Sequence, residues 1–427
     1  RSVTTAAMLQ HAINRRFSEH DGIDRKGLAV AKTDTYVELK VPKLYHNNQD
    51  RYFRVEKLLP ILDTEELREQ RLSLWSRELL DPATAGIAAM RLEGFGPNAV
   101  DVLKKGLQSP DATIRFFSAE ALAYLGDASG VDMLAEAAEK LPEFRKYALL
   151  ALGAMDQAAG LIRLRQLMAS SDANVRYGAF GALRDADPHD ASLGQIRVFD
   201  DSGGEVEESE EAAVSQVMAI ATRRKRPPVR RIDPFSLYAV DCEGPPMVHV
   251  ARTGRSEIVL FGARQDLLTP IVINGQGSLM VNASEGDSSA QISKIMPSAL
   301  DAPDRKVTTS LDVVALIRSM AELGATYPEI LSVLEAASRQ GNLAGTLLVD
   351  AVPVASPVYT QKLLYGSAEP PKKDDALQTT ASQEKASSKR GLLQRWRDRF
   401  RRPAPSPPPS QSSVAGSDQG SVQPKSP

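Results

Sequence analysis

One internal repeat constrains this 427-residue chain more than any other feature of its sequence. Each unit carries an arginine and, seven residues later, a leucine within an alanine-rich stretch. The arginines are 30 and 31 residues apart, at Arg115, Arg145 and Arg176; the leucines keep this spacing, at Leu122, Leu152 and Leu183, with Leu92 one period earlier. Units of this length bury their apolar faces only by stacking on one another. The pattern therefore predicts an all-α stack over residues 82–190, with the leucines in one core.

These units resemble short HEAT-type repeats. Turn sequences of the SPDA and SDAN type precede the first and third arginines, and they contain Asp111 and Asp172. Two roles for the repeat arginines are compatible with this pattern. They can donate hydrogen bonds to the carbonyl groups of the turns or pair with these two aspartates, or they can form a row that binds a partner. With three to four units, the array is near the minimum for a stable stack, so we expect it to lean on a flanking domain.

Residues 307–349 predict two short helices in series. The first is expected to begin at a capping box of Thr309 and Asp312 and to stop at Gly324. The second is expected to begin at a capping box of Thr326 and Glu329 and is followed by an apolar extended run at 347–349. Apolar residues recur at helical spacing in both segments, so the pair should pack against a core.

Short strands are predicted on both sides of the repeats. Alternating or continuous apolar runs occur at 27–31, 36–41, 235–240, 247–251, 257–261, 268–272 and 278–281, and helical spacing occurs at 2–17 and 51–59. The strands at 247–251 and 257–261 are joined through Arg252, Thr253 and Gly254, where the glycine suits a turn with positive φ. Strands outside the helical repeats place the chain in the α+β class.

Several of these segments resemble the flagellar P-ring protein family. The segment SLDVVALIRSMAELGATYPEILSVLEAASRQGNLAGTLLV, at 310–349, is similar to the family's C-terminal end. VARTGRSEIVLFG, at 250–262, resembles a strand pair of the family, and AAMLQHAINRRF with TYVELKVP, between residues 6 and 42, resembles an earlier helix and strand. The family does not ordinarily contain the repeats, which would then be an insertion. Its larger N-terminal portion has no counterpart here, so the resemblance identifies the chain as a fragment.

The resemblance implies both an architecture and a function. Residues 1–62 and 233–353 would be two parts of one small P-ring-like α+β body, interrupted by the all-α HEAT-like solenoid at 82–190. The protein would be a non-enzymatic structural subunit of the flagellar basal body in the periplasm. It would form a homo-oligomeric ring around the rod, with the outer ring and peptidoglycan as further partners. The alternative is a cytoplasmic HEAT-repeat adaptor that binds a protein partner and associates with membrane through its basic tail.

Charge is distributed unevenly although the formal net charge is only -2. Residues 200–232 change from an acidic run to the basic RRKRPPVRR, which is typical of a charged linker. RRKR also resembles a nuclear-import or nucleic-acid patch, but it lacks interleaved aromatic residues, and we expect no nucleic-acid partner. Residues 366–427 are predicted to be disordered. Within them, Lys389–Arg402 reads KRGLLQRWRDRFRR, either a solvated basic tail or an amphipathic helix for a membrane or an acidic partner.

The sequence contains no convincing constellation for catalysis, for a metal or for a cofactor. The histidines show no metal-ligand spacing and no nucleophile motif beside them: His11, His20, His46, His189 and His249. No glycine-rich phosphate loop is present. Cys242 is the single cysteine, so an internal disulfide is excluded. It is most simply a small buried or half-buried apolar residue. We therefore expect a protein that is not an enzyme.

Overall fold

The computed structural model describes residues 2–21, 24–155, 157–199, 205–206, 235–262, 264–295 and 305–366, which all belong to one unit. Helices and strands are both abundant, and the predicted α+β class is confirmed. The charged linker at 200–232 lies outside the described residues except for the short strand β6 (Glu205–Val206). The tail from residue 367 on, including Lys389–Arg402, also lies outside them.

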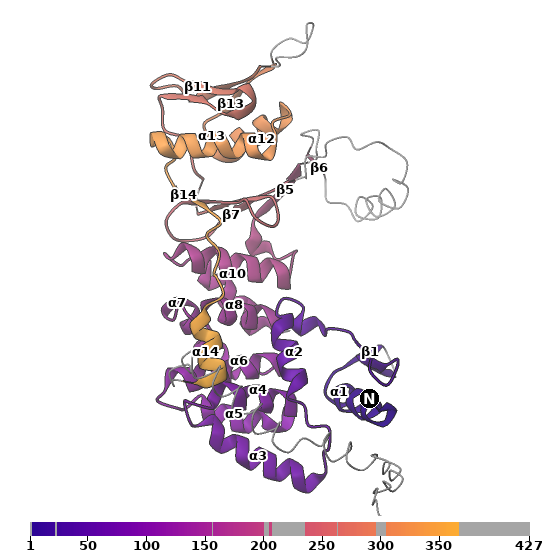
Figure 1. Ribbon diagram of the computed structural model, residues 1–427. Helices are drawn as coiled ribbons and strands as arrows, with labels where there is room; N and C mark the ends of the chain where they lie inside the picture. The colour runs from indigo at the N-terminus through magenta and orange to yellow at the C-terminus, as the bar shows by residue number, and fades with distance from the viewer. Residues whose placement is uncertain are drawn as a thin grey trace, which may run out of the picture. The chain divides into compact units, whose positions relative to one another are not determined.

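The repeats form seven α-helices over the described part of 85–186. They are α4 (Ala85–Phe95), α5 (Val100–Gly106), α6 (Ala112–Tyr124), α7 (Val131–Lys140), α8 (Arg145–Ala154), α9 (Ala158–Leu167) and α10 (Ala173–Ala186). Helices α4, α6, α8 and α10 pack successively on one another, and α7 packs on α8 and α9 (Figure 1). The repeat leucines 92, 122, 152 and 183 are all fully buried in one cluster, which confirms the predicted register.

The repeated turns act as helix caps. Asp111 and Asp172 are the N-cap residues of α6 and α10, and each side chain accepts hydrogen bonds from two backbone N–H groups of the following turn. This use of aspartate satisfies donors that a helix start otherwise leaves unpaired. Helix α3 (Glu65–Leu79), capped by Thr64, precedes the array and packs on α4; no sequence pattern predicted it.

The N-terminal segment packs against the helical array. It comprises α1 (Val3–Arg16), β1 (Ser18–Asp21), β2 (Asp24–Gly27), β3 (Ala29–Ala31), β4 (Val37–Leu39), the 3-10 turn η1 (Lys43–Tyr45) and α2 (Gln49–Lys57). Strand β1 pairs with β2, and β3 with β4, in separate two-stranded sheets. The buried side chains of Phe17, Tyr45, Tyr52 and Val55 belong to the same cluster as the array leucines.

The expectation that residues 1–62 and 233–353 share one α+β body is therefore wrong. None of the sheets formed by the described strands contains strands from both ranges, and the apolar side chains of the two ranges fall largely in two different clusters. Aromatic packing explains the outcome. The Phe17 ring lies 5.7 Å from the Tyr45 ring, and Tyr45 in turn stacks on Tyr124 of α6 at 4.8 Å. Aromatic side chains bury a large area each, so this contact outweighs the weak pairing of three-residue strands.

A six-stranded sheet adjoins the last repeat. Its order is β14-β8-β9-β7-β5-β6, with β5 (Gln195–Phe199), β7 (Phe235–Val240), β8 (Met247–Ala251), β9 (Glu257–Phe261) and β14 (Thr346–Val349). The strands β7, β8 and β9 match their predicted ranges, and Gly254 has φ 85° in the turn between β8 and β9. Both faces are buried: Tyr238 and Phe261 pack with the array, whereas Leu237 and Leu260 pack on the opposite side.

Two helices lie between this sheet and a second one (Figure 1). They are α12 (Val313–Glu322) and α13 (Tyr327–Gln340), as the sequence predicted. The second sheet is antiparallel, with β10 (Ile271–Asn274), β11 (Leu279–Ala283), β12 (Ser289–Lys294) and β13 (Arg305–Ser310) in sequence order. The Thr326–Glu329 capping box is confirmed. The one predicted at Thr309 is wrong, because Thr309 lies in β13 and Asp312 itself caps α12.

After β14 the chain returns along the array. Residues 350–366, here the return segment, end in α14 (Pro357–Tyr365), which packs on α4. The contact is close: a Cβ added at Gly86 of α4 would lie 2.6 Å from the Leu363 carbonyl oxygen, and one at Gly178 would lie 2.5 Å from Pro353. Both glycines are therefore required by packing. The return segment ties the end of the sheet region to the beginning of the array.

Replacing Leu152 by alanine should lower the free energy of unfolding by roughly 2–5 kcal/mol, the range for a fully buried leucine that leaves a cavity. Urea denaturation of the purified chain measures it. Leu80→Ala is the matched control, since Leu80 is 56% exposed and its truncation should cost far less. Equal effects of the two substitutions would show that Leu152 does not lie in the core.

Candidate functional site

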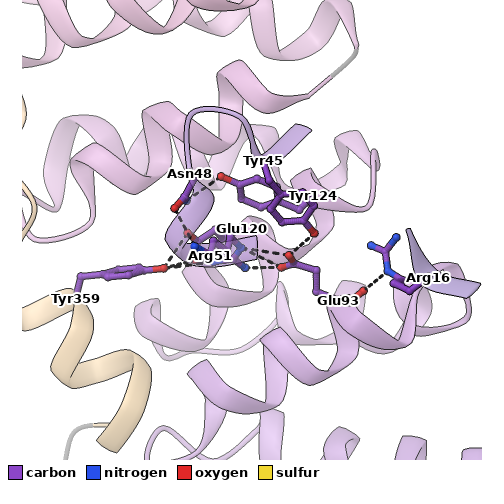
Figure 2. Close-up of polar contacts among 8 residues, drawn as sticks. All are labelled: Arg16, Tyr45, Asn48, Arg51, Glu93, Glu120, Tyr124 and Tyr359. Carbon is purple, nitrogen blue, oxygen red and sulfur yellow. Dashed lines mark hydrogen bonds and ion pairs between the residues drawn. The ribbon is translucent and has the colours of Figure 1, made fainter. Parts of the chain in front are cut away.

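Three deeply buried charged side chains meet where segments distant in sequence converge (Figure 2). Arg51 of α2 is 3% exposed and lies between Glu93 of α4 and Glu120 of α6, both fully buried. The Arg51 Nη2 atom is 2.6 Å from Oε2 of Glu93, and its Nη1 atom is 2.7 Å from Oε2 of Glu120. A buried charge is tolerated only when it is paired and hydrogen-bonded, so each of the three side chains depends on the others.

Tyrosine and asparagine side chains complete this network. The Tyr45 hydroxyl donates to Glu93 over 2.7 Å, and the Tyr359 hydroxyl donates to Glu120 over 3.0 Å. Asn48, which caps α2, donates from Nδ2 to the Tyr124 hydroxyl over 2.9 Å. The Arg51 guanidinium also lies 4.8 Å from the centre of the Tyr124 ring. Because Tyr359 belongs to α14, the network joins the N-terminal segment, two array helices and the return segment.

Burial sets the proton affinity of this cluster. It raises the pKa of Glu120 to about 7, an effect that the neighbouring Arg51 opposes and the nearby Glu93 reinforces. Burial and the Glu120 charge likewise raise the pKa of Tyr359 far above its ordinary value, so its hydroxyl stays protonated and donates. The cluster therefore holds a carboxyl group that titrates near neutral pH inside a packed helical array.

Sequence reasoning missed this network, although a signal for it was present. Glu93 and Glu120 each stand in a mostly apolar helix, in AGIAAMRLEGF and RFFSAEALAY. Both glutamates lie within the apolar face of their repeat helix or directly beside it. An unpaired acid at such a position would lower the stability of the fold. Their partner Arg51 lies outside the repeat and Tyr359 is 239 residues beyond Glu120, so no spacing rule connects them.

A pocket of about 390 Å³ opens beside the network. Residues of the α2 start, of α8 and of the return segment line it: His46, Asn47, Asn48, Gln49, Asp50, Arg51, Arg54, Met90, Lys146, Tyr147, Leu150, Ala355, Tyr359 and Leu363. The Tyr147 and Tyr359 rings stack at 3.4 Å with an interplanar angle of 12°. The volume of this pocket is within the range of ligand pockets.

A second buried polar cluster lies where the sheet meets the array. Glu257 of β9 is 2% exposed; it accepts a hydrogen bond from the Tyr177 hydroxyl and forms an ion pair with Arg184, both of α10. His249 of β8 is fully buried and stacks on Tyr177 with ring centres 3.5 Å apart. Neither ring nitrogen of His249 has a hydrogen-bond partner among the described residues. Burial lowers the pKa of His249 to about 4, so the imidazole is neutral at pH 7.

The repeat arginines have a structural role. Arg115 donates to the carbonyl groups of Ser109 and Pro110, and Arg145 donates to that of Ala138. Arg145 also pairs with Asp172 at 2.9 Å. Of the two roles proposed from the sequence, the structure shows the first: Arg115 binds turn carbonyls and Arg145 pairs with Asp172, while Arg145 also binds a carbonyl at the end of α7.

The third repeat arginine extends this role to the sheet. Arg176, 1% exposed, donates to the Met168 carbonyl within the array and to the Glu243 carbonyl in the β7–β8 connection, each over 2.7 Å. Its Nη2 atom also lies 3.2 Å from the Cys242 sulfur. Cys242 is half-buried, as the sequence suggested. Arg176 therefore fixes the array against the sheet.

Open sheet edges of the described chain lie in the four-stranded sheet. The strands at 247–261 are internal, because β14 covers β8 and β7 covers β9, so their edges cannot accept a neighbouring strand. In the four-stranded sheet of the described chain, the outer strands are β10 and β13. Val272 of β10 is 65% exposed, and its carbonyl accepts a hydrogen bond from Gln340. Apart from this contact, β10 has no partner strand on its outer side among the described residues, so its edge is a candidate for association.

Glutamine at position 120 should flatten the pH dependence of stability. The folded-state pKa of Glu120 is raised from 4.5 to about 7, so this group contributes stability below about pH 4.5 that is lost as the pH rises through 7. From the size of the shift, the loss is on the order of 3 kcal/mol. Urea unfolding at pH 5 and pH 8 should show a smaller difference for Glu120→Gln than for the unchanged chain; an equal difference contradicts the assignment.

His249 should change the stability of the fold with pH in the opposite direction to Glu120. Its folded-state pKa is depressed from 6.5 to about 4, so its contribution is present above about pH 6.5 and is lost as the pH falls through 4. The variant His249→Phe keeps a ring against Tyr177 but cannot be protonated. Between pH 6.5 and 4, it should lose less stability than the unchanged chain, by up to about 3 kcal/mol. Identical acid denaturation curves of the two proteins would contradict this.

Within the described residues, no group of three or more histidine, cysteine, aspartate or glutamate side chains is arranged to hold a metal ion. His11, His46 and His189 are exposed there, and of the three only His46 lines the pocket beside the network. None of the described helices has the length and apolar character needed to cross a membrane. No model of a known protein family matches the chain, and no curated protein is significantly similar to it.

Proposed function

We propose that this protein is a structural subunit of a ring of the flagellar P-ring type. One observation carries the proposal: the two segments with the strongest P-ring resemblance, at 250–262 and 310–349, fold around one core. Helices α12 and α13 pack between the two sheets, and β14 pairs in parallel with β8, from Thr346 opposite Met247 to Val349 opposite Val250. Segments that resemble one family in the same order and share a core support a common module.

The shape of this module suits assembly from identical copies. The four strands of the outer sheet alternate in direction, so its outer strands β10 and β13 run antiparallel to each other. The β13 edge of one copy can therefore pair antiparallel with the β10 edge of the next, and the sheet pattern continues. Such an interface joins two different surfaces, which is the type of contact that closes into rings. Unpaired edge strands are ready templates for such pairing.

A charge placed on the β10 edge should block this assembly. Val272→Arg introduces a cation on a 65% exposed residue, so the fold should persist while the edge no longer fits a neighbouring strand. Val354→Arg, on a residue that is 74% exposed and lies in the return segment, is the matched control. Basal bodies purified from cells that carry each variant, examined by electron microscopy and immunoblotting, should contain the control protein and lack Val272→Arg.

Absence of the unchanged protein from purified basal bodies would overturn the proposed function. Presence of both variants at wild-type levels would leave the flagellar assignment standing and exclude the β10 edge as the interface. The adaptor function remains the second candidate, because the pocket beside Arg51 lies on the array and offers a place for a partner. Purification separates the two candidates: a basal-body subunit co-purifies with detergent-extracted basal bodies, whereas the adaptor remains in the cytoplasm or in the solubilised inner membrane.

A further inference from the structure

Two cations line the pocket beside the buried network without forming an ion pair with a described residue. Arg54 of α2 and Lys146 of α8 both line it and are half-buried. Among the described residues, neither has an ion-pair or hydrogen-bond partner. Partial burial weakens the hydration of a cation, and this cost is recovered when an anion binds to it. The only carboxylate among the lining residues is the exposed Asp50.

The floor of the pocket is rigid. Asn48, Arg51 and Tyr359 line it, and all three are more than nine-tenths buried. The Arg51 guanidinium already forms ion pairs with Glu93 and Glu120. Arg51 and its partners therefore shape the pocket and do not bind an incoming anion. Lys146 and Arg54 are therefore the cations available to a ligand.

The rest of the lining indicates which kind of anion fits. Met90, Leu150 and Leu363 supply apolar surface, and the stacked rings of Tyr147 and Tyr359 add a flat wall. The side-chain amides of Asn47 and Gln49 can both donate and accept hydrogen bonds, as a peptide backbone requires. A free inorganic anion would leave the apolar wall and these amides unused. A volume of about 390 Å³ admits an extended segment or a small molecule but no folded domain.

We propose that this pocket binds an acidic peptide segment, with carboxylate side chains on Arg54 and Lys146 and an apolar side chain against Leu150 and Met90. The proposal concerns this pocket and not the β10 edge, so it stands or falls independently of ring assembly. It gives the repeats a partner of defined chemistry: an extended chain in which glutamate or aspartate alternates with an apolar residue.

Fluorescence anisotropy tests this with the full chain and a labelled ten-residue peptide of alternating glutamate and leucine. The double variant Arg54→Gln/Lys146→Gln should weaken binding about tenfold or more, because two charge pairs are lost. The matched control is Arg77→Gln/Lys105→Gln, which removes the same charges from exposed positions outside the pocket and should change binding less than about twofold. Raising the salt concentration should weaken binding to the unchanged chain and have less effect on the pocket variant.

Three results would overturn the proposal. They are absence of peptide binding up to about 1 mM, equal weakening by the two double variants, and binding of inorganic phosphate without binding of the peptide. The last would mean that the pocket takes a free anion. Thermal unfolding of each variant checks the fold. If the double variant is destabilised, the single variant Lys146→Gln replaces it, with a loss of several-fold expected, and an unchanged affinity then counts against the proposal.

Discussion

The ion pairs of Arg51 with Glu93 and Glu120 are the constraint on which the rest of the array depends. One arginine serves two fully buried carboxylates, and the three side chains come from three helices. Removal of Arg51 would leave two acids in an apolar core, a loss of the kind that costs several kcal/mol. Tyr359 of the return segment donates a hydrogen bond to Glu120 of the same cluster. The buried charges therefore also hold the return segment on the array. The network fixes α2 and α14 on the array more specifically than apolar packing alone could.

The six-stranded sheet plays a corresponding part at the other end of the array. Its faces are both buried, one against the last repeat and one against α12 and α13. Arg176, Tyr177 and Arg184, all on α10, reach from the array to the sheet through carbonyl, carboxylate and ring contacts. The titrating groups at the two places change the stability of the fold with pH in opposite directions. Low pH stabilises the folded state through Glu120 and destabilises it through the buried neutral His249. Between pH 4 and 7, these two groups therefore change the free energy of unfolding in opposite directions.

The proposed assembly and the proposed peptide pocket use different surfaces. The assembly edge belongs to the outer four-stranded sheet at β10, whereas the pocket lies between α2, α8 and the return segment. A subunit built in this way can join identical neighbours through one region and receive an unrelated extended segment in the other. This separation is why one variant on each surface distinguishes the two proposals.

The sequence by itself determined the local structure: the repeat period with its four buried leucines, the strands at 235–240, 247–251 and 257–261, and the two helices before residue 341. These follow from periodicity and capping, which act over a few residues. Only the tertiary structure decided that the N-terminal segment packs on the array and that Thr309 joins a strand. It also decided that Arg51 meets Glu93, Glu120 and Tyr359. Those outcomes depend on burial of aromatic and charged groups between segments up to 308 residues apart, which no local pattern encodes.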